Sequence, residues 1–241
     1  MQHSCKLVLI CKSTEAALGW RPFSYIPRLK VLSTMIRKNP RGDIPVIDPS
    51  AFVDPTAILC GRVEVRANVF IGPYAVIRAD EVDADGHMEP IIIGAHSNIQ
   101  DGVVIHSKSG AAVNIGERTS IAHRAIVHGP CQVGDGVFIG FNSVLFNCTI
   151  GDGCVIRHNA VVDGCRLPAD FYVPSTERIG PRTELSSIPK VSAQASEFSE
   201  DVARTNNELV QGYKRIQNEF LGDIIGGFYL GDWRYVYVMD V

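Results

Sequence analysis

An apolar residue recurs at every sixth position along most of the chain, and this period restricts the fold more than any other feature. Six is neither the period of a helix nor that of a strand, but a short strand followed by a corner has this length. Three such sides close one coil of about 18 residues, which is the pattern of a hexapeptide β-helix. The repeated positions are Val53, Leu59, Val65, Ile71, Ile77, Ile93, Ile99, Ile105, Ile115, Ile121, Val127, Val133, Ile139, Leu145, Ile150, Ile156 and Val162.

Two breaks in the period predict loops that leave the solenoid. Ile77 and Ile93 are sixteen positions apart, which we interpret as two periods plus four inserted residues within "ADEVDADGHMEP". Ile105 and Ile115 are ten positions apart, which indicates one period plus four inserted residues within "SKSGAA". Loops on a rigid scaffold often carry function.

The repeat and its flanks predict five regions. Residues 1–40 form a poorly ordered extension, 41–175 an all-β solenoid, and 176–198 a proline-rich crossover. A helix over 199–225, with Ser199 as its N-cap, packs alongside the solenoid. Residues 226–241 are an aromatic tail of unknown structure.

Composition excludes several classes of protein. The net charge is −3 and no basic run occurs, which argues against a nucleic-acid partner. No stretch is long enough to cross a bilayer, and the apolar run Leu7–Cys11 is too short for a signal peptide. Seven cysteines without a CxxC pair favour reduced thiols and a cytoplasmic location.

Three histidines have related phases in the repeat. His106 follows Ile105 and His128 follows Val127, so the two histidines are one coil plus one insertion apart. They should stack in adjacent coils about 4.8 Å apart and share a metal ion. His123 lies roughly 16 Å of extended chain from His128. We therefore expect a homotrimer in which a neighbouring subunit supplies His123 at each interface.

Other polar residues fall on the same phases. Because Gln100 and Asp101 lie one coil before Ala122 and His123, we expect them in the His123 column. We place Arg78 there too, with the loop residues Asp80 and Glu81 beside it. Any single histidine would more often be an ordinary hydrogen-bonded residue, and Arg78 with Asp101 would suffice for an intersubunit salt bridge. We assign no role to the four other histidines, His3, His87, His96 and His158.

Three imidazoles on a divalent metal leave an open coordination position, the pattern of catalytic zinc. Such a metal lowers the pKa of bound water to about 7, and CO2 is an electrophile that needs little beyond hydroxide. Gln100 would orient the hydroxide, and Glu81 would accept the proton released in each cycle. Arg78 is expected to be structural, with a further role near bicarbonate.

Four motifs resemble those of the gamma-class carbonic anhydrases, over about residues 45–215. They are "VIRADE", "IGAHSNIQDGVVIH", "TSIAHRAIVHGP" and "VGDGVFIGFNSVLFN". The resemblance implies a left-handed parallel β-helix trimer with a C-terminal helix. It implies zinc, or Fe2+ or Co2+, bound by His106 and His128 of one chain and His123 of its neighbour. Family motif positions are also matched by Arg78, Asp80, Glu81, Gln100 and Asp101, and Asn206 resembles an asparagine that faces the site.

One departure keeps other functions open. The loop "HSKSGAAVN" after His106 is short, carries Lys108 and has no acid, so Glu81 or buffer must take the proton. This loop is similar to that of a carbonic-anhydrase-like domain in a carboxysome scaffold. The first hypothesis is a carbonate dehydratase, a lyase that interconverts CO2 and bicarbonate. The second is a non-catalytic assembly module of carboxysome or respiratory-complex type, with partners bound by the terminal extensions. The third is a hexapeptide acyltransferase.

Overall fold

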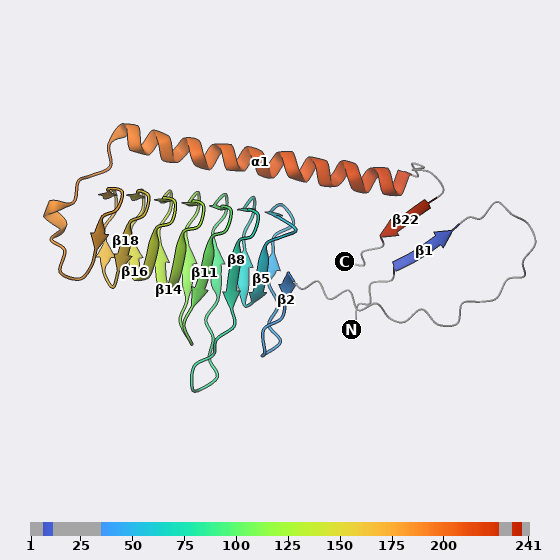
Figure 1. Cartoon of the computed structure of the whole chain (residues 1–241), viewed down its shortest axis with the longest axis horizontal. Coiled ribbons are helices and arrows are strands. Elements are labelled where there is room, and N and C mark those ends of the chain that lie inside the picture. The colour runs from blue at the N-terminus through green and yellow to red at the C-terminus, as the bar shows by residue number, and fades with distance from the viewer. Residues whose placement is uncertain (1–6, 12–34, 227–232, 238–241) are drawn as a thin grey trace, which may run out of the picture. The chain divides into compact units, whose positions relative to one another are not determined.

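The computed structural model describes residues 7–11, 35–226 and 233–237. The chain divides into two compact units, one of Ser33–Gly212 and one that combines Met1–Leu32 with Tyr213–Val241. The first unit is a left-handed parallel β-helix, as the repeat and the resemblance predicted, and its stacked coils are visible in Figure 1.

Each coil has three sides. Equivalent sides of successive coils stack into three faces, and the strands within each face are parallel. Face 1 contains β2 (Ile36–Arg37), β5 (Ile58–Gly61), β8 (Val76–Ala79), β11 (Val104–Ser107), the first parts of β14 (Ile126–Val133) and β16 (Val144–Ile150), β18 (Val161–Asp163) and β21 (Arg178–Ile179). Face 2 contains β3 (Val46–Ile47), β6 (Val63–Val65), β9 (Ile91–Ile93), β12 (Val113–Ile115), the last parts of β14 and β16, and β19 (Arg166–Leu167). Face 3 contains β4 (Phe52–Val53), β7 (Phe70–Ile71), β10 (Asn98–Ile99), β13 (Ser120–Ile121), β15 (Phe138–Ile139), β17 (Val155–Ile156) and β20 (Tyr172–Val173).

The residues of the six-residue period form the core. On face 3, Ile71, Ile99, Ile121 and Ile139 pair in register from coil to coil and are fully buried. Their side chains point inward because the residues of a strand alternate between its two sides. Burying one such side chain stabilises the fold by about 1.5–3 kcal/mol, so the stacked columns account for much of the stability.

The first insertion is longer than the sequence interpretation allowed. Ile93 pairs with Val65 on face 2, so it lies one side after Ile77, not two. Ten extra residues therefore leave the solenoid after β8, and the interpretation as two periods plus four was wrong. The second insertion, between Ile105 and Ile115, has the predicted length because Ile115 pairs with Ile93.

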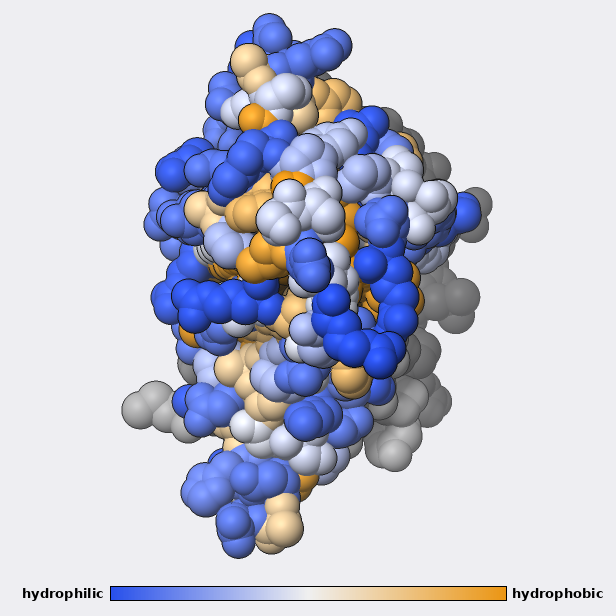
Figure 2. Space-filling view, turned by 90° about the vertical axis from the view of Figure 1, so that its left-hand side faces the viewer, coloured by the Kyte–Doolittle hydropathy of each residue, from blue (hydrophilic) through white to orange (hydrophobic). Residues whose placement is uncertain are grey.

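The crossover after the last coil covers the end of the solenoid. It includes the short 3-10 helix η1 (Leu185–Ser187), and Ile188 is buried against the core together with Leu185. Lys190 lies over the Phe171 ring, with its Nζ 3.9 Å from the ring centroid. A solenoid needs such a cap because its last coil has no neighbour to bury its apolar edge. Figure 2 views this end, where hydrophilic residues surround small hydrophobic areas.

Helix α1 (Ala193–Gly226) begins six residues before the predicted start. Ser192, not Ser199, is at its N-terminus, where the Ser192 hydroxyl accepts a hydrogen bond from the Ala195 backbone at 3.2 Å. Within the first unit, α1 packs on face 3, since Val202 contacts the cluster of Phe138 and Val155. Among the described residues, no helix combines the length and apolar character that a membrane span requires.

Strands occur in both terminal regions. β1 (Leu7–Cys11) pairs antiparallel with β22 (Trp233–Tyr237), so part of the expected disordered extension and part of the aromatic tail form a two-stranded sheet. The rest of both predicted regions before residue 35 and after 226 lies outside the described residues.

Gly94 stands where the backbones of two adjacent coils approach closely, and this predicts a large effect of Gly94→Ala. A Cβ atom at Gly94 would lie 2.5 Å from the carbonyl carbon of Gly116 in the next coil. Because the neighbour is backbone, we expect Gly94→Ala to destabilise the fold by about 3 kcal/mol. Gly212→Ala is the control, since nothing lies within 4 Å of its Cβ position and alanine is favoured in helices by about 1 kcal/mol. Urea unfolding measures both changes, and equal stabilities for the two variants would contradict the stacking.

Candidate metal centre

His106 and His128 lie side by side on the outside of face 1. β11 and β14 pair in the register Ile105 with Val127 and His106 with His128, which confirms the predicted stacking. The Nδ1 atom of His106 is 3.4 Å from the Nε2 atom of His128. Two nitrogens bound at 2.0–2.1 Å to one tetrahedral zinc ion lie about 3.3 Å apart, so this pair fits two positions of one metal.

The hydrogen-bond partners of the two rings favour tautomers in which both facing nitrogens can act as ligands. The Nδ1 atom of His128 is 3.1 Å from the carbonyl oxygen of Gly129, to which it donates, so its Nε2 keeps the lone pair. The Nε2 atom of His106 is 3.2 Å from Asp80 Oδ1 and slightly farther, 3.3 Å, from Arg78 Nη2. A carboxylate that accepts this proton leaves the lone pair on Nδ1, the usual arrangement of metal-binding histidines.

The acidic loop after β8 supplies the surroundings of His106. Glu81 Oε1 lies 3.5 Å from His106 Nε2, and the Glu81 side chain is half exposed. Arg78 Nη1 lies 3.4 Å from Asp80 Oδ2 and offsets its charge. The placement of Arg78 in the His123 column was wrong, because Arg78 pairs directly with His106 across β8 and β11. The ten-residue insertion causes this difference, since it moves Arg78 by one full side.

His123 belongs to a separate column near face 3. Its Nδ1 atom is 3.7 Å from Asp101 Oδ2 in the preceding coil, as the phases predicted. The ring of Phe141 lies 5.2 Å from that of His123 and stacks on His158 at 4.5 Å. The Phe141 amide donates to His158 Nδ1 at 3.0 Å. Burial, with the Arg157 charge, lowers the pKa of His158, so the ring stays neutral and can accept this bond.

Gln100 is held by two residues that the sequence analysis did not single out. Its Nε2 donates to Asn98 Oδ1 at 3.0 Å, and Asn98 Nδ2 donates to Ser120 Oγ at 2.7 Å. All three side chains are buried. Their position in the repeat could have identified them. Asn98 and Ser120 each precede an isoleucine that points into the core, so their own side chains point outward and stack in adjacent coils. Asn206 on α1 is buried too, with its amide bonded to the Val202 carbonyl at 2.9 Å.

Buried thiols lie directly beneath His128. Cys131 Sγ is 3.2 Å from the His128 carbonyl and 3.9 Å from Cys148 Sγ. The hydrogen bond with Cys131, together with burial, raises the pKa of Cys148, which stays protonated at neutral pH. The Cys131 thiol therefore helps to hold the His128 backbone.

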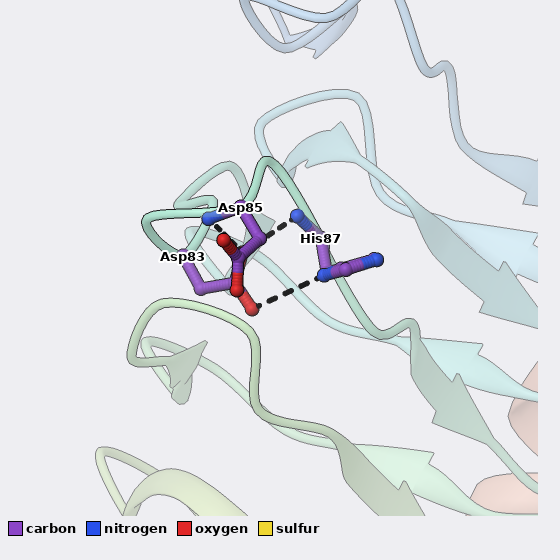
Figure 3. Close-up of side chains that lie close together, drawn as sticks. All are labelled: Asp83, Asp85 and His87. Atoms are coloured by element: carbon purple, nitrogen blue, oxygen red, sulfur yellow. Dashed lines mark hydrogen bonds and ion pairs between the residues drawn. The ribbon is translucent and has the colours of Figure 1, made fainter.

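A third cluster, in the first inserted loop, is a turn. Among the described residues, Asp83, Asp85 and His87 form the only group of three side chains whose possible metal-ligand atoms all lie within 4.8 Å of one another. The Asp83 carboxylate accepts the amides of Asp85 at 3.0 Å and His87 at 2.7 Å, as Figure 3 shows. The His87 amide bond is the main cause of the lowered pKa of Asp83. We assign these groups to folding the loop.

The two columns do not meet within one chain. One column holds Arg78, Asp80, Glu81, His106 and His128, and the other holds Gln100, Asp101 and His123. In the part of the chain that the structure describes, no hydrogen bond or ion pair joins a residue of one column to a residue of the other. The described residues of one chain therefore bring together two of the three predicted histidine ligands, and His123 lies in the other column.

The solenoid defines a hexapeptide-repeat protein, and the pair of His106 and His128 on face 1 is its candidate metal centre. The family described as bacterial transferase hexapeptide (six repeats) matches residues 112–147. The carbonic anhydrase of Methanosarcina thermophila is 36% identical over 197 residues, which cover 73% of this chain and 77% of that protein. The chain belongs to the gamma-class carbonic anhydrase family.

Two further similarities are to a longer protein and to a solved structure. The carboxysome assembly protein CcmM of Nostoc sp. is 38% identical over 177 residues, which cover 69% of this chain but only 31% of CcmM. A solved hexapeptide transferase family protein from Anaplasma phagocytophilum superposes with a TM-score of 0.63 at 21% identity, over 76% of this chain and 99% of that one. The second similarity supports the fold alone.

Proposed function

We propose that this protein is a metal-dependent carbonic anhydrase that catalyses the reversible hydration of CO2 to bicarbonate. The observation that carries the proposal is the in-register pair of His106 and His128, whose facing nitrogens are 3.4 Å apart. Zinc is the first choice of metal, and iron or cobalt would accept the same ligands. When bound, the ion would supply Lewis-acid activation of water at neutral pH.

Other residues of the chain would position the ligands, transfer the proton and orient the reacting water. Asp80 holds the His106 ring, and Arg78 holds Asp80. Glu81, half exposed and 3.5 Å from His106, would receive the proton released in each cycle and pass it to solvent. Because its Nε2 is committed to Asn98, Gln100 would present its carbonyl oxygen to the reacting water. Asn206 would line the site from α1.

A homotrimer would complete the site by adding His123 from the neighbouring chain. Face 1 has the surface that such an interface needs, because an outward apolar column runs beside His106 and His128. Its members are Ile58, Val76, Val104, Ile126, Val144 and Val161. Ile126 is 40% exposed in the single chain. Burying this column between subunits would remove it from water.

The free cysteines are consistent with a reducing compartment, so we place the protein in the cytoplasm. The five cysteines of the β-helix unit, Cys60, Cys131, Cys148, Cys154 and Cys165, are free thiols. Partners beyond CO2, bicarbonate and further copies of the chain would be bound through the terminal regions.

Stopped-flow measurement of CO2 hydration tests the proposed activity. We expect the metal-loaded protein to hydrate CO2, a chelator to abolish the activity, and added zinc or cobalt to restore it.

The loop between β11 and β12 has no acid, and CcmM is a relative, so a non-catalytic assembly module is the second candidate. A metal-loaded trimer without hydration activity would favour that candidate, and acyl transfer from coenzyme A would favour an acyltransferase.

A further inference from the structure

Asn39, between β2 and β3 in the first coil of the solenoid, contacts both ends of the acidic loop. Its Nδ2 atom donates to the carbonyl oxygen of Ala79 at 3.1 Å, and Ala79 directly precedes Asp80. The same atom donates to Asp43 Oδ2 at 2.9 Å and lies 3.3 Å from the sulfur of Met88, at the far end of the loop. Asn39 and Met88 are only 5% and 4% exposed. One buried amide therefore links the residues on either side of Asp80 and Glu81.

The surroundings of Asn39 are shaped for this contact. Its Oδ1 atom accepts the backbone amides of Arg41 and Asp43, each at 3.0 Å, which fixes the orientation of the side chain. A Cβ atom at Gly61 would lie 1.9 Å from the Ala79 oxygen and 2.9 Å from Asn39 Nδ2. Glycine at this position, with φ of +80°, therefore leaves the space in which the amide and the carbonyl meet.

Two arginines bind the outer half of the loop. Arg62 Nη1 donates to the Met88 carbonyl at 2.7 Å, and Arg41 donates to the carbonyl oxygen of Gly86. The Asp83 turn closes the tip of the loop (Figure 3). Hydrogen bonds therefore hold the loop at Ala79, where it begins, at Met88, where it ends, and at Gly86, near its tip.

We infer that residues 38–43 form a clamp that positions Glu81 for proton transfer, with Asn39 as its central residue. The inference rests on the proposed function. The clamp acts through Ala79, because it fixes the backbone from which Asp80 and Glu81 extend toward His106. Ser109 supports the same carboxylate with a hydroxyl 3.5 Å from Glu81 Oε2. Without the clamp, Glu81 spends less time within reach of the site, and the proton leaves more slowly.

The kinetic test uses Asn39→Ala in the metal-loaded protein. Positioned general bases contribute about 100-fold or more to a rate, and partial loss of position should lower kcat by about tenfold at low buffer concentration. High buffer concentration should restore kcat because buffer replaces Glu81, while kcat/KM stays within about twofold. Asn114→Ala is the matched control, since the Asn114 amide bonds only to the exposed Gln132. A fall in kcat and kcat/KM together, without rescue by buffer, would overturn the inference.

Hydrogen–deuterium exchange of the metal-free protein tests the clamp without activity. We expect the amides of residues 81–88 to exchange at least about tenfold faster in Asn39→Ala, while those of β10 and β13 are unchanged. Arg41→Ala, at an exposed residue, keeps the test decisive if Asn39→Ala does not fold, and should speed exchange near Gly86. Unchanged exchange in the loop would overturn the clamp. If the normal protein shows no CO2 hydration, the proposed function and the catalytic role of the clamp both fail, and exchange still decides whether the clamp exists.

Discussion

We expect His106→Ala and His128→Ala each to lose the bound metal and to lower the rate of CO2 hydration by about 1,000-fold. In the proposed site the two facing nitrogens would supply two of the three protein ligands, and either substitution leaves only one histidine of this pair. A catalytic metal contributes several kcal/mol to lowering the barrier, and each 1.36 kcal/mol is a factor of ten in rate. Metal analysis and stopped-flow hydration of the purified variants measure both effects.

His96→Ala is the control for these variants. His96 is an exposed histidine whose Nδ1 lies 3.3 Å from Asn207 on α1, outside both columns. We expect its metal content and hydration rate to match those of the unsubstituted protein. Full activity in His106→Ala or His128→Ala would show that the pair is an ordinary stacked hydrogen-bonded pair and that the metal site lies elsewhere.

The fold and the histidine pair could be predicted because both depend on local spacing. A buried residue at every sixth position sets the sides of the coil, and the 22-residue separation of His106 and His128 includes only the short second insertion. Stacking in a solenoid follows directly once the lengths of the coils are known.

Arg78 was misplaced because the length of a loop cannot be read from a six-residue period. The spacing between Ile77 and Ile93 fits either one period plus ten inserted residues or two periods plus four inserted residues. Only the pairing of Ile93 with Val65 decides between them. The longer insertion places Arg78 and Asp80 beside His106, where Asp80 contacts the imidazole and Arg78 pairs with Asp80.

Asn98, Ser120 and Asn39 were missed for a different reason. Each is polar, and a polar residue in an outward or flanking position is expected to face solvent. Their burial depends on what covers them, and the hydrogen bonds they make span many residues of sequence. The start of α1 was also missed, because Ser192 and Ser199 are equally good caps by composition.

The sharing of one metal between chains is tested most directly by mixing two inactive variants. His123→Ala keeps the His106–His128 pair, and the double variant His106→Ala/His128→Ala keeps His123. Each homotrimer should bind little metal and be inactive. After the two are unfolded together in equal amounts and refolded, random assembly of cyclic trimers should complete about a quarter of the sites. Metal content and CO2 hydration should both recover to about a quarter of those of the unsubstituted protein, and no recovery in mixtures shown to contain hybrid trimers would contradict a site built from two chains.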